Sequence, residues 1–384
     1  MWVGFAAYLG ALGLAPRLSR HRAGRRFAWG TIVLFVLGFA VAPVLLSHDV
    51  YSYVDYARLG VVHGLDPYFH PPAAAPADPV YPDVEWTEAT SAYGPLFTLA
   101  TYPLAWLPVE AAVAALKALA AASVLGLAAL VARLAPVRGL DPLRAAAFVA
   151  LNPLVLVHVV GGAHNDGLAM LIAMLGVAAV LAAREAVGGA AFVIAIAIKA
   201  SIAVFAPFAV LAAARRECSP STDREVDRGS ALRPIGGASR GSVLALATGA
   251  AVAVLAIAIV AYTAFGWDWL GAFGLAGENQ DRTSHMSIPI TAARLTGLDP
   301  TAVRATALGL YAAFVIYLLA WTWRGNDWLR AAAWASLSLL LATAWLLPWY
   351  LIWALPLAAL SRDRSLQLLL LGLTAYQLGA RIPL

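Results

Sequence analysis

The sequence predicts an all-α protein that crosses a membrane about 10 times, with additional short helices that enter the membrane or lie along its surface. Composition is the first support, because 62% of the 384 residues are hydrophobic and only 12% are charged. The mean hydropathy of +0.78 is too high for a water-soluble domain. The second support is the succession of apolar runs, several long enough for a membrane-spanning helix.

The apolar runs account for most of the chain, and without an internal repeat we expect residues 1–384 to form a single domain. The first run does not fit a cleaved signal peptide, because its positive charges follow the apolar stretch. Segment 215–241 is rich in Arg, Ser and Gly and is expected to be a flexible loop. In order, the runs are 1–15, 28–47, 109–134, 144–160, 166–183, 189–214, 242–265, 301–323, 329–347, 350–360 and 365–380.

The distribution of arginines predicts the orientation of these runs. "RLSRHRAGRR" (17–26) has five arginines and no acid, which places it in the cytoplasm. Alternation from there places the 215–241 loop in the cytoplasm as well. Run 189–214 breaks the alternation, because both of its ends must lie inside and Lys199 stands near its middle. We therefore expect two short re-entrant helices meeting near Lys199, a geometry tolerated where it lines a protein cavity.

The long first outer loop, 48–92, carries the first candidate chemistry. Asp49 is the first acid after the apolar run 28–47, and it is either a helix N-cap or a functional carboxylate. Tyr53 and Tyr56 share its face if a helix begins near Asp49. Arg58 is expected to pair with Asp55 three residues earlier, and it also suits an anionic head group.

The motif "GGAHNDGLAML" (161–171) is the second outer cluster. Gly-Gly followed by Asn165 and Asp166 is a common sequence pattern at the start of a helix, so Asn165 or Asp166 could be the N-cap. His164 is not explained by capping. It could donate to a phosphate, hold the Asp49 carboxylate, or be a histidine at the membrane interface without a ligand. No second histidine stands at metal-ligand spacing and Cys218 is the only cysteine, so we expect no metal site and no disulfide framework.

Three further groups belong to the same predicted side of the membrane. "GENQDRTSHMSIP" (277–289) contains His285 and is either a solvated loop or part of the site. "AWLLPWYLIWALP" (344–356) offers Trp349 and Tyr350 as an aromatic belt or a sugar-stacking surface. A lysine at membrane depth costs roughly 3 kcal/mol, so Lys199 is expected to snorkel or to serve function.

Several of these motifs together resemble a known family. "SHDVYSYVDYARL", "GLDPY", "SAYGPL", "NPLVL" followed by "GGAHNDGL", "AIAIKAS" and "LPWYLIWALPL" resemble the polyprenol-phosphate-mannose-dependent α-1,6-mannosyltransferases. These are integral-membrane glycosyltransferases of the GT-C class. The resemblance covers residues 28–360, and the acid–tyrosine and "HND" elements are its most specific part. The chain looks short for the family, without a long soluble tail and extra spans.

The resemblance implies a GT-C-like bundle in the cell membrane, with the site in the extracytoplasmic loop 48–92 and Asp49 as catalytic base. Mannose would pass from a polyprenyl phosphate to a hydroxyl of a glycan or lipoglycan with inversion, giving an α-1,6 linkage without a cofactor. A phosphate leaving group needs no proton, so one carboxylate suffices, whereas glycoside hydrolysis usually needs two. The candidate phosphate ligands are Lys199, His164, Arg58 and His285, and the candidate substrate contacts are Tyr53, Tyr56, Asn165, Asp166, Trp349 and Tyr350.

Two other functions remain open from the residues alone. A secondary transporter would also have many spans and buried ionisable groups, although these usually lie near the midplane within repeats. A ligase or polymerase of lipid-linked oligosaccharides would take a pyrophosphate-linked donor instead. The net charge of +5 could suggest nucleic acid, but the arginines lie between apolar runs, as membrane orientation requires, so no nucleic-acid partner is expected.

Overall fold

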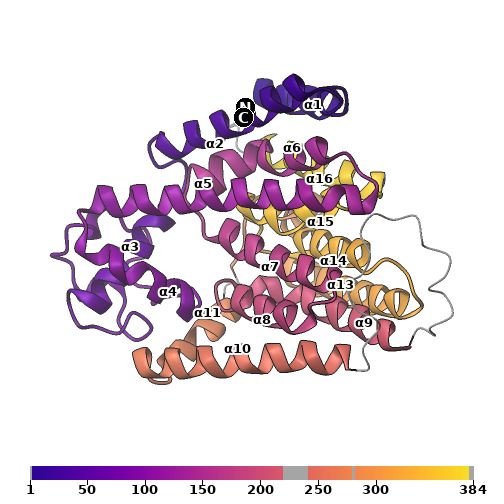
Figure 1. Cartoon of the computed structure of the whole chain (residues 1–384). Helices are drawn as coiled ribbons and strands as arrows, with labels where there is room; N and C mark the ends of the chain where they lie inside the picture. The colour runs from indigo at the N-terminus through magenta and orange to yellow at the C-terminus, as the bar shows by residue number, and fades with distance from the viewer. Residues whose placement is uncertain (1, 219–240, 279–281, 380–384) are drawn as a thin grey trace.

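The computed structural model describes residues 2–218, 241–278 and 282–379, and these ranges contain helices and no strand (Figure 1). The all-α class is therefore confirmed. The α-helices are α1 (Trp2–Leu18), α2 (Arg22–Val41), α3 (Asp49–Val61), α4 (Pro95–Thr101), α5 (Val109–Leu134), α6 (Pro142–Ala150), α7 (Asp166–Leu181), α8 (Glu185–Ile196), α9 (Ala206–Cys218), α10 (Ser242–Phe265), α11 (Gly271–Glu278), α12 (Ile288–Thr296), α13 (Pro300–Trp323), α14 (Trp328–Ala342), α15 (Leu355–Ala359) and α16 (Arg364–Gly379).

Shorter helical turns connect these helices. One of them, η5, is a π-helix, a rare form that is frequently found at functional sites. The turns are η1 (Pro72–Ala74), η2 (Tyr81–Asp83), η3 (Tyr102–Trp106), η4 (Ala135–Arg138), η5 (Val155–Val160), η6 (Ala200–Phe205), η8 (Asp268–Leu270) and η9 (Pro348–Trp353).

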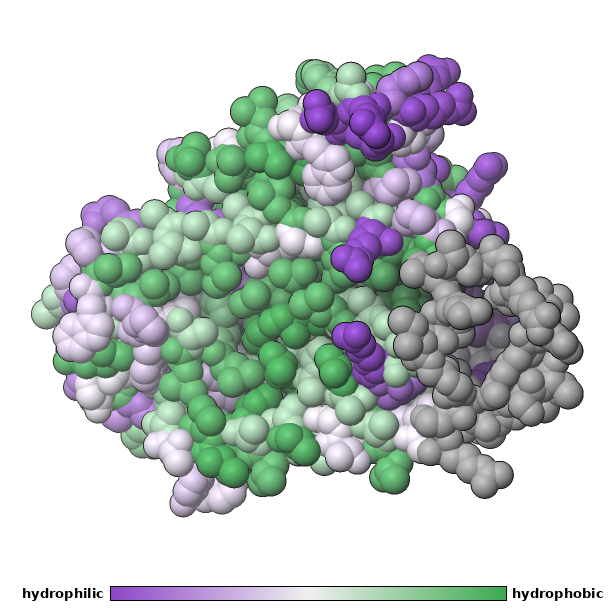
Figure 2. Space-filling view, in the orientation of Figure 1, coloured by the Kyte–Doolittle hydropathy of each residue, from purple (hydrophilic) through white to green (hydrophobic). Residues whose placement is uncertain are grey.

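Four helical segments are long and apolar enough to cross a membrane: α2, α5 with η4, α10 and α13. Shorter apolar helices, α7, α8, Ala200–Arg215 and α14, accompany them. Apolar side chains cover the middle of the face shown in Figure 2, and hydrophilic side chains gather around the α1–α2 turn. The protein therefore has the surface of a membrane protein, while the count of about 10 crossings stays a prediction.

Local capping explains where several helices begin. The side chains of Asp141, Asp299 and Asp327 each accept a backbone N–H in the first turn of α6, α13 and α14. Proline follows the first two of these acids, at a position where its missing N–H leaves no hydrogen bond unmade. These starts are therefore specified by neighbouring residues in the sequence.

The predicted interruption of run 189–214 is present. α8 ends at Ile196, Lys199 has an extended backbone, and the chain resumes as η6 and then α9. Lys199 lies beside Asp166, the first residue of α7, so the α8–η6 junction reaches the end of the bundle where α7 begins. Most of the expected loop 215–241 lies outside the described residues, and α9 continues through its first part to Cys218.

The elements are arranged so that α5 runs along the bundle between two polar ends. Figure 1 shows α3 and α4 together at one end, beside the start of α5. Near this end Lys117 of α5 donates to the carbonyls of Ala42 and Pro43, which follow α2. The first outer loop thus begins at a point fixed by a buried lysine, a partner that the sequence did not reveal.

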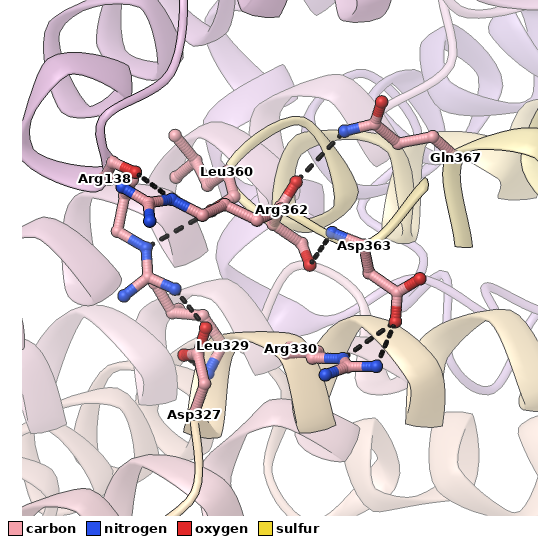
Figure 3. Close-up of polar contacts among 9 residues, drawn as sticks. Arg138, Asp327, Leu329, Arg330, Leu360, Arg362, Asp363 and Gln367 are labelled. Atoms are coloured by element: carbon pink, nitrogen blue, oxygen red, sulfur yellow. Dashed lines mark hydrogen bonds and ion pairs between the residues drawn. The ribbon is translucent and has the colours of Figure 1, made fainter. Parts of the chain in front are cut away.

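At the other end of α5, ion pairs connect the neighbouring segments (Figure 3). Arg138 pairs with Asp327 at the start of α14, and Arg362 donates to the Arg138 carbonyl oxygen over 2.9 Å. Asp363 accepts from Arg330 at 2.7 Å. Charged side chains at this end therefore join η4, α14 and the α15–α16 turn.

Candidate functional site

Asp49 lies in the first turn of α3, directly after the segment that follows α2. The N-cap position belongs to His48, and the Asp49 carboxylate does not cap the helix. One carboxylate oxygen accepts the indole N–H of Trp86 at 3.3 Å, and the other lies 3.6 Å from Nδ1 of His164. The capping interpretation is therefore wrong, and the carboxylate faces the rest of the cluster.

His164 is presented by an unusual stretch of backbone. The π-helix η5 precedes it, and Ala163 has a φ of 55°, a left-handed conformation that is costly for a residue with a Cβ. The imidazole is fully buried and stacks on Trp349, with ring centroids 3.7 Å apart and planes 17° apart. The structure thus holds the His164 ring against Asp49, as one of the sequence interpretations proposed.

Lys199 and Asp166 form the second half of the cluster. The Lys199 ammonium lies 3.2 Å from the buried Asp166 carboxylate, and the indole of Trp353 donates to the same carboxylate at 2.8 Å. Lys199 also lies 5.8 Å from the ring centroid of Tyr350, which stacks on Trp353. Lys199 is therefore not an unpaired charge, because Asp166 comes close to it from a distant part of the chain.

Burial changes the acidity of Asp49. Loss of hydration raises the pKa of its carboxyl to about 6, against the opposing effects of the Lys199 charge and the Trp86 hydrogen bond. The side chain is still 17% exposed, so a small molecule can reach it. A carboxylate with this pKa is ionised at neutral pH and is a better proton acceptor than an ordinary aspartate.

The tyrosines of α3 are buried behind the carboxylate. Tyr53 packs edge-on against Tyr93 and Phe97, with ring centroids 4.7 and 4.9 Å away. Tyr56 donates its hydroxyl to the carbonyl of Ala89 at 2.8 Å. Both tyrosines fix the return of the outer loop onto α3, so their direct contact with a substrate stays a prediction.

The Arg58 side chain binds another residue, Asp78, and not Asp49. It follows Asp49 by nine residues, and at about 100° per residue this places it on the opposite face of α3. Its guanidinium binds Asp78 at 2.8 Å, and His63 contacts the same carboxylate at 2.7 Å. The predicted Asp55–Arg58 pair is wrong, because Asp78 from the loop takes the arginine. Burial, together with the charge of Asp78, raises the pKa of Asp55 to about 7.

The remaining predicted residues differ in their position. Asn165 is buried at the N-cap position of α7, where its side chain makes no capping bond. His285 is exposed, and its carbonyl oxygen accepts the hydroxyl of Thr291. The neighbouring Arg282 instead stacks on Trp86, with its guanidinium carbon 4.7 Å from the ring centroid.

Sequence reasoning missed Trp86, and it placed Arg282 and Trp353 in candidate clusters without identifying their contacts. A tryptophan in the polar segment "PDVEWTEAT" was the available signal for Trp86, since a large aromatic ring in such a loop needs a partner. Nothing near Arg282 in the sequence identified its ring contacts. In the part of the chain that the structure describes, no group of three or more His, Cys, Asp or Glu residues could hold a metal ion.

The arrangement can perform acid–base chemistry at one end of a helical membrane scaffold. Asp49 can take a proton, His164 and Trp86 orient its carboxylate, and Lys199 supplies positive charge on the same side. Aromatic rings from η9 pack against the cluster, with Trp349 stacked on His164 and Tyr350 stacked on Trp353. These features fit the class of helical membrane glycosyltransferases.

Comparison with known proteins gives the family. Residues 1–215 match the family model described as alpha-(1->6)-mannopyranosyltransferase, N-terminal domain. The chain is also 31% identical to alpha-(1->6)-mannopyranosyltransferase A of Mycobacterium tuberculosis, over 98% of this chain and 73% of the relative. The chain therefore belongs to the α-(1→6)-mannopyranosyltransferase family, which confirms the resemblance found in the motifs.

Other relatives match over shorter lengths. Alpha-(1->6)-mannopyranosyltransferase A of Corynebacterium glutamicum is 28% identical over 55% of this chain and 45% of its own length. A probable alpha-(1->6)-mannopyranosyltransferase of Mycolicibacterium smegmatis is 31% identical over 41% of this chain and 30% of its own length. No solved structure matches the chain.

Proposed function

We propose that this protein transfers mannose from a polyprenyl-phosphate donor to a hydroxyl of a glycan or lipoglycan, forming an α-1,6 linkage with inversion. The observation that carries the proposal is the Asp49 cluster, in which one accessible carboxylate with a raised pKa faces an imidazole, an indole and a lysine. The names of the relatives support mannose as the sugar. All of residues 1–384 would form one transferase domain.

The reaction needs one proton acceptor and one stabilised leaving group. The acceptor hydroxyl gives its proton to Asp49 while its oxygen forms a bond to the anomeric carbon of mannose. The bond from that carbon to the phosphate oxygen breaks, and its electron pair leaves with polyprenyl phosphate. Direct displacement inverts the anomeric centre, so a β-linked donor gives an α-linked product.

We further propose that the protein is a multi-pass membrane protein with the Asp49 end on the extracytoplasmic side. The arginines of segment 17–26 begin α2 and Asp49 follows its end, so a helix of 20 residues, about 30 Å long, separates them. Arginines concentrate on the cytoplasmic side in membrane proteins. The long loop 48–92 then lies outside, and 215–241 inside.

The experiment that tests the activity uses the purified protein in lipid nanodiscs. Radiolabelled polyprenyl-phosphate mannose is supplied with an α-mannan oligosaccharide acceptor, and the product linkage is determined by NMR. An α-1,6-linked product is expected. In a parallel assay with the protein in sealed vesicles, uptake of the sugar without transfer would favour a transporter. Use of only pyrophosphate-linked oligosaccharide in the nanodiscs would favour a ligase.

The orientation is tested by labelling single cysteines in intact cells, in a Cys218→Ser background. Glu88→Cys in the first outer loop should react with a membrane-impermeant maleimide, because its side chain is exposed and the proposed orientation puts this loop outside. Arg184→Cys, exposed in the α7–α8 turn, should react only after the cells are opened. The reverse pattern would overturn the proposed orientation.

A further inference from the structure

The charge balance around Asp49 is unfavourable for an anionic donor. Asp166 and Glu85 act on Asp49 as neighbouring negative charges, and Lys199 acts as the positive one. Lys199 already lies 3.2 Å from the Asp166 carboxylate, which compensates its charge. A phosphate carries one negative charge in the donor and gains a second as it leaves. The site therefore needs another cation at the point where this charge develops.

The other cations predicted from sequence do not fill this need. Arg58 is held by Asp78 on the opposite face of α3. His164 lies against Asp49 itself and stacks on Trp349, which ties its ring to the base. His285 is exposed beside Thr291. A cation for the phosphate must therefore come from another residue.

Arg282 lies beside the Asp49 cluster, on the ring of Trp86. Its guanidinium lies over two indoles, 4.7 Å from the Trp86 centroid and 5.9 Å from the Trp345 centroid. Trp86 is the same ring that donates to Asp49. The backbone N–H of Ser284 donates to the carbonyl of Ala344 at 2.8 Å, so the segment carrying Arg282 is fastened beside Trp345.

The chemistry of a stacked arginine suits a phosphate. Ring contacts hold the plane of the guanidinium and leave the N–H groups at its edge free to form paired hydrogen bonds with phosphate oxygens. The Arg282 side chain is exposed, so an anion can reach it without displacing the protein core. Among the side chains of residues 2–215, 241–274 and 282–379, no carboxylate forms an ion pair or a hydrogen bond with Arg282.

We propose that Arg282 binds the phosphate of the lipid donor and of the polyprenyl-phosphate product. This inference rests on the proposed transferase function. Trp86 then orients two groups at once, the base through its N–H and the phosphate-binding arginine through its ring face. As the bond between the anomeric carbon and oxygen breaks, its electron pair moves to the phosphate, and Arg282 stabilises the added negative charge.

The test compares Arg282→Gln with Arg294→Gln, a matched loss of an exposed arginine on α12. Both are placed in zwitterionic-lipid nanodiscs and checked for equal thermal unfolding. For Arg282→Gln we expect kcat/KM for the donor to fall about 100-fold and the KM for the acceptor to stay unchanged. Arg294→Gln should match the wild type, and Arg282→Lys should lie between, because an ammonium keeps the charge without the paired donors.

A second measurement is direct binding of sugar-free polyprenyl phosphate, with phosphatidylglycerol and inorganic phosphate as competitors. Arg282→Gln should weaken this binding by at least about tenfold, and phosphatidylglycerol and inorganic phosphate should not compete. Normal binding and normal donor kinetics in Arg282→Gln would overturn the inference while leaving the transferase function standing. A wild type that binds polyprenyl phosphate through Arg282 but transfers no mannose would instead overturn the proposed function alone.

Discussion

Two aspartates at opposite ends of α5, Asp49 and Asp363, each accept a hydrogen bond from a tryptophan indole, yet their environments differ. Asp363 accepts from Arg330 at 2.7 Å and from Trp334 at 2.9 Å. Although burial acts to raise the pKa of Asp363, these bonds and one from the Leu366 backbone bring it below its usual value. Asp49 has only the 3.3 Å bond from Trp86 and the nearby His164 ring, and its pKa is raised.

The difference shows what each carboxylate is suited to do. An arginine and two further donors occupy the lone pairs of Asp363 and stabilise its ionised form. In return, this carboxylate stabilises the fold around it. A carboxylate that is buried with few donors keeps lone pairs available for a substrate proton. The network in Figure 3 is therefore expected to contribute stability, and the Asp49 cluster to contribute turnover at some cost in stability.

The largest expected effect is from Asp49→Asn. The amide keeps the shape of the side chain but cannot accept the proton, so kcat should fall by about 10³- to 10⁴-fold. The thermal unfolding temperature should be unchanged or slightly higher, because a poorly hydrated charge has been removed. Steady-state transfer assays on purified protein measure the rate, with Asp83→Asn, an exposed acid of the same loop, as control. Near-normal transfer would show that Asp49 is not the base.

The next largest effect is on Lys199. In Lys199→Met the buried Asp166 carboxylate loses its cation, so the free energy of unfolding should fall by about 3 kcal/mol. Adding Asp166→Asn should restore most of this stability, because the uncompensated charge is gone. Unfolding in detergent, monitored by tryptophan fluorescence, measures both variants. If the double variant also transferred mannose normally, the lysine would serve only to neutralise Asp166.

Asp363→Asn tests the opposite end of the comparison. Loss of the charged partner of Arg330 should lower the free energy of unfolding by about 2 kcal/mol, while the folded protein keeps its transfer rate. The pKa of Asp363 is lower in the folded protein than in the unfolded chain, where it is about 3.9. The stabilisation by the Asp363 carboxylate is therefore present above that pH, and it is lost as the pH falls through the pKa of the folded protein. A large loss of kcat in this variant would contradict the division of roles.

The smallest expected effect is a shift in a pH profile. In the wild type, the transfer rate should decrease below a pH of about 6, since protonated Asp49 cannot accept the hydroxyl proton. Trp86→Phe keeps a ring for Arg282 but removes the indole N–H that favours the ionised carboxylate. The acidic limb should then move upward by up to about one pH unit, the equivalent of one hydrogen bond. An unmoved limb would show that the Trp86 bond does not tune the base.

Of the caps expected from the sequence, those at Asp49 and Asn165 are absent. The sequence did determine the helical class, the starts of α6, α13 and α14, and the break at Lys199. These features depend on composition and on residues within one turn of each other, such as Asp299 before Pro300. Asp49 could be singled out because it directly follows an apolar run and carries the motif that resembles the family. The sequence also predicted that His164 and Lys199 would come to the same end as Asp49, because alternating spans bring distant loops together.

Only the tertiary structure decided which charges meet. Arg58 pairs with Asp78 rather than Asp55, and Lys199 pairs with Asp166. Trp86 donates to Asp49, and Arg282 from another loop stacks on Trp86. Loop paths have no periodicity from which such contacts can be derived, and each depends on how segments far apart in the chain pack. A buried ionisable group either pairs with an opposite charge or has a shifted pKa, and the fold as a whole decides which of the two occurs.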